Sequence, residues 1–429
     1  MGWRTFTPRA YGFGASAVGL WLTGVLTGVP ELFMLAVAAL VLPLGAWVVV
    51  RFGRYRLACV RTVRPLRATV GSRIAANVRL QNPSRFETGV LLLEDQLPYQ
   101  FGPAARFVVP GIAGGDRETL HYELTAMTRG RYTIGPLSVR LLDPFGLAQV
   151  TSQVAGTSEV IVHPRVEGLP APGMGGDFAS ASAARVRRLF TRGDEFYTTR
   201  EYRDGDDLRK VHWRSSAKRG QLMIRQEEQP WRARALVAVD LRRHAHNGHG
   251  EHSSLERTIS ATASMVVRLA RSGYELALVT ESGERVQPPT GSDQAAALLD
   301  YLATVGPSRG ESLVPLANQL GRLSGEGLLL TVLTVPDSEE AAVLARARLG
   351  FGGALALLVR SDTWLGLAAR DLAAGDARAA GAAAMLERAG WRTAAMTRTD
   401  RLETPWKRLT APLGRAAPTS RRRSPSSAS

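Results

Sequence analysis

The start of the chain is almost entirely apolar and predicts two membrane-spanning helices. Residues 10–30 carry no charged side chain, Glu31 interrupts them, and residues 32–50 again carry none. A helix needs about 20 apolar residues to cross a bilayer, so spans at about residues 11–29 and 32–50 fit a helical hairpin with a tight turn at Val29, Pro30 and Glu31. A cleavable signal peptide would have a shorter apolar core, without a second span directly after it. Residues 1–56 are therefore expected to form a transmembrane hairpin.

Residues 57–165 show a different pattern, in which short apolar stretches alternate with Gly, Pro and Asn turn signals. The stretches predict strands at residues 74–80, 90–94, 106–109, 119–124, 131–134, 137–141 and 160–163. Because no helical period competes with them, this spacing indicates a small antiparallel β-sandwich. Within it, Asp143, Pro144, Phe145 and Gly146 predict a rigid corner whose acid accepts turn amides and whose aromatic ring is buried.

From residue 235 onward, strand and helix patterns alternate. The expected strands are residues 235–240, 275–280, 328–335, 354–359 and 393–396, and the expected helices are residues 255–271, 293–304, 338–348 and 370–389. This alternation predicts a doubly wound, mostly parallel α/β domain over residues 235–400. Such a sheet binds ligands at the carboxyl ends of its strands, where Asp240 stands. Residues 166–184, rich in Gly, Pro, Ala and Ser, predict a linker before it.

The distribution of charge sets the orientation and excludes one class of partner. The chain has 54 Lys and Arg against 38 Asp and Glu, a net charge of +16. The excess positive charge lies beside the hairpin, in residues 185–234 and in the tail. A nucleic-acid-binding protein would spread its basic residues over one groove-facing surface, so nucleic acid is not the expected partner. Arginines on both flanks of the hairpin, from Arg4 to Arg9 and from Arg51 to Arg67, place both chain ends and all later domains in the cytoplasm, at the cell (plasma) membrane. The single Cys59 excludes an intramolecular disulfide and suits that compartment. Residues 401–429 are expected to form a basic, disordered tail.

The densest charge pattern, in residues 185–234, permits several interpretations. Asp206 and Asp207 could coordinate a cation or act in acid–base chemistry, and the arginines could clamp a phosphate or carboxylate. Alternatively, the two acids cap a helix and the ion pairs hold the segment against a neighbouring domain, or the segment is a partner-binding face. His212, beside Trp213, has no second His or Cys nearby in sequence and is read as a packed or capping residue. The residues by themselves favour structural ion pairing.

This segment resembles the bacterial domain-of-unknown-function-58 family, whose hallmark is a Glu-Phe, Arg-Glu-Tyr, Gly-Asp, Arg, Trp and Ser-Ala-Arg pattern in this order. The matching residues are Glu195, Phe196, Arg200, Glu201, Tyr202, Gly205, Asp206, Arg209, Trp213, Ser216, Ala217 and Arg219, with Lys218 as a local variation. The resemblance implies two membrane spans, a β domain and a von Willebrand factor A-like domain. It implies no settled biochemical activity, but a working association with MoxR-type AAA+ ATPases and other membrane proteins.

Asp240 is the residue to weigh for metal binding. Metal-binding von Willebrand factor A-type domains place Asp-x-Ser-x-Ser after the first strand, where one carboxylate and two hydroxyls supply oxygen ligands to Mg²⁺. The corresponding residues are Asp240, Arg242 and His244, so two oxygen ligands are replaced and the position is a degenerate metal site. Asp240 is expected to pair with Arg242 or Arg243, or to cap a turn.

Four histidines crowd the loop after this strand: His244, His246, His249 and His252. Imidazoles at such short spacing can bind zinc, nickel or copper, but no carboxylate or Cys is placed to fix the geometry, so adventitious or no metal binding is expected. The sequence also contains no phosphate-binding Gly-x4-Gly-Lys-Ser/Thr loop and no Gly-x-Ser-x-Gly nucleophile elbow.

These patterns together predict a membrane-anchored cytoplasmic scaffold or adaptor, without enzymatic activity, cofactor or resident metal. Its expected partners are other proteins, among which the family resemblance implies a MoxR-type AAA+ ATPase in a membrane or envelope assembly process. The alternative is a metal-dependent adaptor or an uncharacterised enzyme that uses Asp206, Asp207 and His212.

Overall fold

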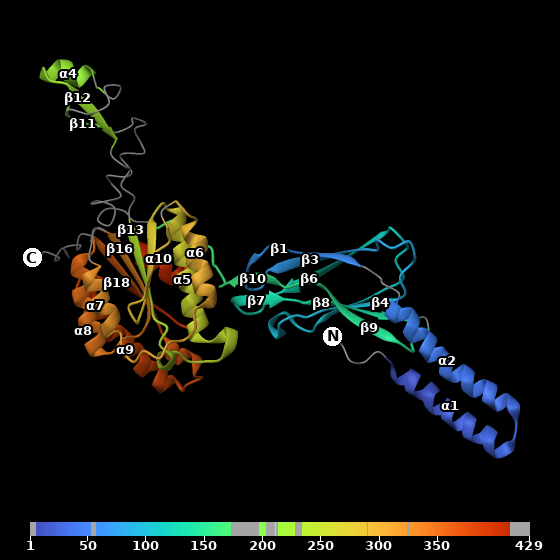
Figure 1. The fold of residues 1–429 in the computed structure, drawn as a ribbon. Coiled ribbons are helices and arrows are strands. Elements are labelled where there is room, and N and C mark those ends of the chain that lie inside the picture. The colour runs from blue at the N-terminus through green and yellow to red at the C-terminus, as the bar shows by residue number, and fades with distance from the viewer. Residues whose placement is uncertain are drawn as a thin grey trace, which may run out of the picture. The chain divides into compact units, whose positions relative to one another are not determined.

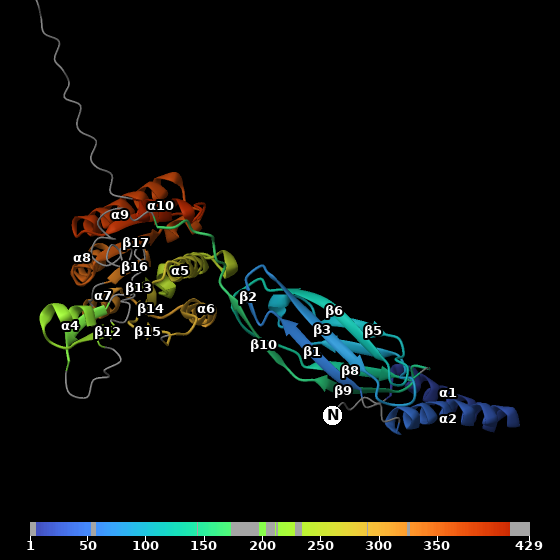
Figure 2. The same ribbon diagram turned by 90° about the horizontal axis from the view of Figure 1, so that it is seen from above.

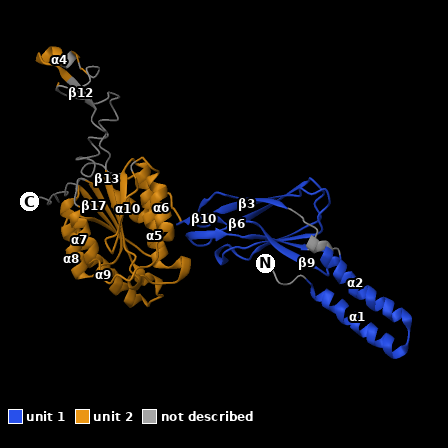
Figure 3. Cartoon of the chain, viewed as in Figure 1, with its two compact units in different colours: residues 1–164 blue, residues 165–429 orange. Residues whose placement is uncertain are grey.

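The chain divides between residues 164 and 165 into two units (Figure 3). The computed structural model describes residues 6–52, 57–143, 145–172, 197–202, 211, 213–227, 234–289, 291–323 and 327–411.

The first unit begins with two antiparallel helices, α1 (Pro8–Thr27) and α2 (Pro30–Phe52) (Figure 1). Both are long and apolar enough to cross a membrane, which confirms the two apolar helices expected from the sequence. Gly28 ends α1 in the left-handed region at φ +71°, and its amide donates to the Gly24 carbonyl, 2.9 Å away. The turn is shorter than expected, because Glu31 lies in the first turn of α2, where an acid complements the helix dipole. At Gly24 the helices are close enough that a Cβ would lie 3.3 Å from the side chains of Leu32 and Phe33.

A strand-rich region of several sheets follows the helices. Its strands are β1 (Ala58–Arg64), β2 (Arg67–Thr69), β3 (Arg73–Gln81), β4 (Leu91–Asp95), β5 (Ala105–Val109), β6 (Arg117–Thr125), β7 (Gly130–Ile134), β8 (Leu137–Leu142), β9 (Gln149–Ala155) and β10 (Ser158–His163). They form sheets in the orders β1-β3-β6, β2-β10-β7 and β5-β4-β8-β9, and only the β2–β10 pairing is parallel among these described strands. All the expected strands are present. The sequence pattern missed β1, β2 and β9, which are short or only half buried.

A buried ion pair links several strands of this region. Arg61 on β1 donates from Nη1 to the Asp95 carboxylate at 2.7 Å and from Nη2 to the Ile134 carbonyl at 2.9 Å, and the Tyr122 hydroxyl donates to the other Asp95 oxygen. The Arg61 and Asp95 side chains are 2% and 0% exposed. Burial, and then the hydrogen bond to Asp95, raise the pKa of Tyr122, so its hydroxyl stays a donor. Burial likewise raises the pKa of the Cys59 thiol to about 11.

The corner after β8 is rigid, as expected, but its aromatic ring is not buried. The Asp143 carboxylate accepts the amides of Phe145, Leu147 and Ala148 at 2.9, 2.6 and 2.6 Å. Gly146 adopts φ +67°, which favours glycine. Phe145 is 65% exposed, so the expectation of a buried ring was wrong: the apolar side chain that the corner buries is Leu147, which is 2% exposed. Pro144 lies outside the described residues.

The second unit contains a six-stranded sheet in the order β15-β14-β13-β16-β17-β18. Its strands are β13 (Arg234–Val239), β14 (Glu275–Thr280), β15 (Arg285–Val286), β16 (Gly327–Thr334), β17 (Gly353–Val359) and β18 (Arg392–Met396). All pairings are parallel except that of the short edge strand β15. Because β14 follows β13 on one side and β16 follows on the other, the chain reverses its winding at β13. The gap between the carboxyl ends of β13 and β16 is the place where such sheets bind ligands.

Helices cover both faces of this sheet. They are α5 (Ser254–Arg271), α6 (Gln294–Thr304), α7 (Val314–Arg322), α8 (Ser338–Ala347), α9 (Ala369–Arg388) and α10 (Glu403–Thr410). Side chains of α5, α6 and α10 share one apolar core, and those of α7, α8 and α9 share the other. Figure 2 shows α5 and α6 on one side of the strands and α7 and α8 on the opposite side. The expected strands and helices are confirmed, while α7, β15 and α10 were not expected.

Two segments expected to be unstructured are partly folded. In the expected linker, Leu169 enters the core of the second unit and the Pro170 carbonyl accepts the indole N–H of Trp406 at 3.0 Å. In the expected tail, residues 403–410 form α10, and Trp406 is 0% exposed. The prediction of disorder from residue 401 was therefore wrong as far as Ala411, because Leu402, Trp406 and Leu409 recur at helical spacing and find a core to bury in. Residues 173–184 and 412–429 lie outside the described residues.

Candidate functional site

The family-motif segment is described only in part. Two strands, β11 (Tyr197–Glu201) and β12 (Met223–Glu227), pair antiparallel, and a short helix, α4 (Trp213–Arg219), precedes β12. Arg200 and Glu201 lie in β11, Tyr202 follows it, and Trp213, Ser216, Ala217 and Arg219 lie in α4. The motif residues outside the described residues are Glu195, Phe196, Gly205, Asp206 and Arg209, together with the alternative site residues Asp207 and His212.

Within the described part of this segment, two hydrogen bonds connect α4 and the ends of the two strands. The Met223 amide donates to the Ser216 hydroxyl at 2.9 Å, and the Tyr202 amide donates to the Leu222 carbonyl at 2.9 Å. Met223 is 1% exposed, whereas Trp213 is 71% exposed. The role of the motif, structural or partner-binding, stays a prediction.

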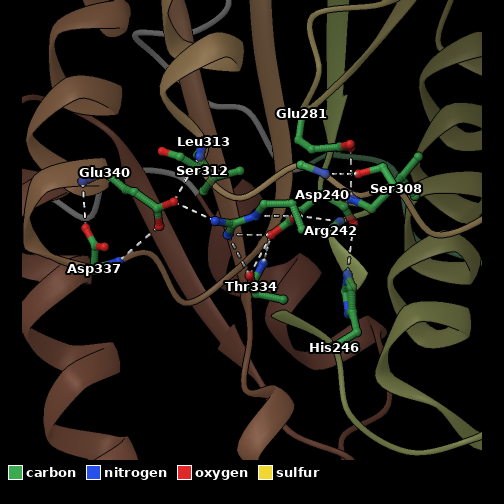
Figure 4. A network of polar contacts seen from close by, with 12 residues as sticks. Asp240, Arg242, His246, Glu281, Ser308, Ser312, Leu313, Thr334, Asp337 and Glu340 are labelled. Atoms are coloured by element: carbon green, nitrogen blue, oxygen red, sulfur yellow. Dashed lines mark hydrogen bonds and ion pairs between the residues drawn. The ribbon is translucent and has the colours of Figure 1, made fainter. Parts of the chain in front are cut away.

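The most highly organised polar cluster lies at the carboxyl edge of the sheet in the second unit (Figure 4). Asp240 follows β13 directly and is 0% exposed. The Arg242 guanidinium, two residues later, donates from Nε to Asp240 Oδ1 and from Nη2 to Asp240 Oδ2, both at 3.0 Å. The Thr334 hydroxyl, at the end of β16, donates to Asp240 Oδ2 at 2.5 Å. Asp240 thus pairs with Arg242, one of the two arginines expected from the sequence.

A second carboxylate completes the surroundings of the guanidinium. Glu340 on α8 accepts from Arg242 Nη1 at 2.5 Å through Oε1, which also accepts the Leu313 amide at 2.9 Å. Its other oxygen takes part in the capping box of α8, in which Asp337 is the N-cap residue. Glu340 therefore joins the start of two helices to the end of β13. A buried cation held by two carboxylates and a hydroxyl is the result.

The electrostatics of the cluster follow from burial and pairing. Burial by itself would raise the pKa of Asp240, but the hydrogen bonds and charge of Arg242, with the Thr334 hydroxyl, outweigh it and hold the pKa below its ordinary value. Burial opposes the charged form of Arg242 as well, yet Asp240 and Glu340 raise its pKa. Both partners are therefore ionised at neutral pH. Glu281, at the end of β14, accepts the Leu241 amide at 3.0 Å through Oε2, while its buried Oε1 has no hydrogen-bond partner.

The histidine loop separates into one structural residue and three that lie at or near the surface. His246 Nε2 lies 3.0 Å from the Asp240 carbonyl oxygen, and Nδ1 lies 3.1 Å from the Ser254 hydroxyl. Burial lowers the pKa of His246, so the ring is neutral at pH 7. His244, His249 and His252 are exposed. Across the described ranges, no group of three or more His, Cys, Asp and Glu side chains is placed to hold a metal ion.

A cleft of about 480 Å³ opens beside this cluster. Arg242, Thr334 and Glu340 line its inner part, and residues after β17 and one face of α9 line its sides. There Arg360 donates to both oxygens of Asp362 at 2.8 Å, to the Leu372 carbonyl at 3.0 Å, and to Asp376. A Cβ at Gly375 would lie 1.9 Å from Asp362 Oδ2, so only glycine permits this approach of α9. Arg378, on the same face of α9, is exposed at the cleft.

Sequence reasoning found Asp240 but missed most of its partners. Glu340 and Thr334 lie about a hundred residues away, and only the fold brings them together. Arg360 and Asp362 carried a local signal that was overlooked: each of two apolar strands, β13 and β17, is followed by an acid and an arginine two residues apart, Asp240 with Arg242 and Arg360 with Asp362. This repeated pairing at strand ends marks the edge that becomes the cleft.

Comparison with known proteins supports the family resemblance but adds no activity. No curated protein matches the chain. Similar solved structures include the CARDB domain of a Pyrococcus furiosus protein in complex with di-metal ions, 13% identical, covering 25% of this chain and 93% of that chain with a TM-score of 0.20. They also include a Bordetella pertussis protein described as ApaA, 13% identical over 25% of this chain and 94% of that chain, and red sea bream transglutaminase, 16% identical over 25% and 15%, both with TM-scores of 0.20. Residues 198–333 match the model of the family described as protein of unknown function DUF58. The match covers about a third of the chain, with most of the central motif and the sheet strands from β13 to β16, and it supports the DUF58 family that the motif predicted.

Proposed function

We propose that this protein is a membrane-anchored cytoplasmic adaptor, without catalytic activity, and that the cleft in its second unit binds a protein partner of the MoxR-type AAA+ ATPase class. The two apolar helices supply the anchor. The arginines that flank them support an orientation with both termini and both soluble parts in the cytoplasm. The cleft supplies a recessed, charged surface of a size suited to a few side chains of a partner.

One observation carries the proposal: a guanidinium occupies the position at which a reactive or metal-binding centre would lie. We infer that the second unit is von Willebrand factor A-like, and metal-binding domains of that kind hold a Mg²⁺ ion after the first strand. Here Arg242 stands among Asp240, Glu340 and Thr334 as a built-in cation, 3% exposed. Its donors are engaged by the protein itself, so it fixes the shape of the edge rather than exchanging ligands.

The same network argues against catalysis at this edge. A general base or nucleophile needs an accessible atom and a pKa suited to proton transfer at working pH. Asp240 is fully buried and held in its ionised form, and Arg360 is likewise bound by Asp362 and Asp376. The groups that remain available at the cleft, such as Arg378 and His244, lie at its surface. They are suited to contacts with a partner's side chains.

Binding of a MoxR-type AAA+ ATPase from the same organism to charge-reversal variants tests the proposal. The full chain, purified in detergent, is immobilised and the ATPase is passed over it, with Arg378→Glu as the cleft variant. Arg388→Glu, exposed on the same helix but outside the cleft lining, is the matched control. We expect Arg378→Glu to lose retention and stimulation of the ATPase while Arg388→Glu keeps both. Equal binding by all three chains would refute the cleft as the docking surface, and no binding by the wild type would refute this partner.

The enzyme alternative predicts a different pattern. Joint alanine substitution of Asp206, Asp207 and His212 would abolish cellular function without lowering thermal stability or ATPase binding. Under the adaptor proposal, loss of function in that variant accompanies loss of stability or of binding.

A further inference from the structure

The corner after β8 is joined directly to the start of the first apolar helix. The Thr7 amide donates to the Leu147 carbonyl at 2.9 Å, and the Thr7 hydroxyl donates to the Gly146 carbonyl at 2.6 Å. Phe6 forms an isolated bridge with Ala148. Ala10 and Ala46, from the two helices, pack with Leu147 and Ala148 in one buried cluster. The corner and the open end of the hairpin are therefore one rigid piece within the first unit.

The length of α1 fixes the depth of this corner if the hairpin spans a bilayer. Its 20 residues, Pro8–Thr27, extend about 30 Å at 1.5 Å per residue. The hydrocarbon core of a bilayer is also about 30 Å thick, so α1 has no length to spare. Pro8 then lies at the boundary between hydrocarbon and headgroups. The corner that bonds to Thr7 must lie at the level of the headgroups.

The chemistry of the corner suits that environment. Asp143 already accepts three amides of the corner, so those groups need no water when they enter a region of low polarity. Phe145 is 65% exposed and extends from this rigid turn. The Arg9 guanidinium lies beside the next residue of the turn, 3.3 Å from where a Cβ at Gly146 would stand. An exposed ring and an arginine on the same corner suit the boundary of acyl chains and phosphates.

A second exposed ring lies at the same end of the unit. Leu91, at the start of β4, pairs with Leu141, near the end of β8, so the loop before β4 lies at the same sheet end as the corner. Phe86 in that loop is 77% exposed. By the same register, Asp95 pairs with Leu137, and the loop after β4, with Tyr99 at 88% exposure, lies at the opposite end.

We propose that this end of the first unit sits on the bilayer that the hairpin spans, with the Phe145 ring inserted among the lipid acyl chains just below the headgroups and Arg9 at the phosphates. The proposal rests on the membrane anchoring proposed above and extends it from the helices to the β region. The membrane thereby fixes the tilt of the first unit. The hairpin and the Phe145 ring hold it at two separate points, and a rotation of the unit would change the depth of at least one of them.

Spin labels at three positions test the proposal in the full chain. Cys59→Ala removes the native thiol, and single cysteines are introduced as Phe145→Cys, Tyr99→Cys and Val18→Cys, the last being 59% exposed near the middle of α1. Each labelled chain is reconstituted into phosphatidylcholine–phosphatidylglycerol vesicles. The collision rates of the label with oxygen, which concentrates in lipid, and with a water-soluble nickel chelate are then measured. Unchanged thermal unfolding relative to the Cys59→Ala chain shows that each variant is folded.

The expected order is clear for each position. The ratio of oxygen to nickel accessibility is highest at residue 18, several-fold lower but still lipid-like at residue 145, and lowest at residue 99. If the accessibility ratio at residue 145 equals that at residue 99 while residue 18 gives a lipid value, the hairpin is anchored but the corner stays in water. That result overturns the present proposal and leaves the membrane anchor standing. If the ratio at residue 18 is that of a label in water, both this proposal and the membrane anchor proposed above are overturned.

Discussion

Replacing Arg242 by methionine tests whether its guanidinium holds the carboxyl edge of the second unit together. Methionine keeps part of the apolar stem but removes the hydrogen bonds to Asp240, Glu340 and Thr334. It leaves the two carboxylates, 0% and 7% exposed, without a cation. Removing one partner of a buried ion pair costs about 3–5 kcal/mol, so we expect a loss of this size in the free energy of unfolding of the second unit at pH 7.

This loss should shrink in acid. In the wild type, the folded pKa of Asp240 lies below its unfolded value of about 3.9, so the carboxylate contributes stability above that value, which is lost as the pH falls through the lower folded pKa. Without Arg242, burial dominates and raises the folded pKa of Asp240 above the unfolded value. The destabilisation is then complete above the raised pKa and is relieved as the pH falls through it. The deficit of Arg242→Met is therefore larger at pH 7 than at pH 5.

Urea-dependent hydrogen–deuterium exchange of peptides from β13 and β16 measures the second unit separately from the first. Arg243→Met, at the exposed neighbouring position, is the control and should change the unfolding free energy by no more than about 0.5 kcal/mol. The double variant Asp240→Asn/Arg242→Met should lose less than the sum of the single losses. A cost of about 1 kcal/mol or less, the scale of an exposed ion pair, or strict additivity would refute the reasoning.

Three further predictions concern other parts of the chain. Asp95→Ala, which leaves Arg61 buried without its partner, should destabilise the first unit by about 3–5 kcal/mol in the same exchange experiment and leave the second unit unchanged. Ending the chain after Ala411 should leave the thermal unfolding of the second unit unchanged, whereas ending it after Asp400 removes the buried Trp406 and should cost at least about 3–5 kcal/mol; equal stabilities would contradict the packing of α10. Because burial lowers the folded pKa of His246 below its ordinary 6.5, the unfolded state binds more protons and stability falls as the pH drops from about 6.5 toward the folded pKa; His246→Gln should flatten this part of a stability–pH curve, and an unchanged slope would contradict it.

The spacing of apolar residues predicted most of the elements, because in these elements the buried positions recur with the period of the hydrogen-bonded helix or strand. The strands of the parallel sheet are apolar on both faces, and the helices between them have one apolar side, so both patterns are visible in the sequence. The two errors about disorder share one physical cause. Trp406 and Leu169 occur in stretches whose composition suggests disorder, and their burial depends on a core built by distant residues.

Only the residues of the candidate site that are close together in the sequence could be predicted. Asp240 and Arg242 stand two residues apart, so their pairing was one of the outcomes expected from the sequence. Glu340 reaches them because α8 begins at the end of β16, next to β13 in the sheet but almost a hundred residues later in the chain. At the Asp143 corner, turn chemistry predicted the hydrogen bonds, whereas the choice of the buried side chain, Leu147 in place of Phe145, depends on packing against Ala10 and Ala46 of the helices.

The central part of our proposal is that Arg242 takes the place of a metal ion and makes the edge of the second unit a fixed binding surface. A Mn²⁺ titration of the full chain in detergent tests it most directly. Mn²⁺ is a paramagnetic substitute for Mg²⁺, and the electron paramagnetic resonance signal measures how much of it stays free. Wild type and Asp240→Asn should take up Mn²⁺ to the same small extent, because the carboxylate is already occupied by the guanidinium. Saturable Mn²⁺ binding by the wild type that disappears in Asp240→Asn would contradict the account.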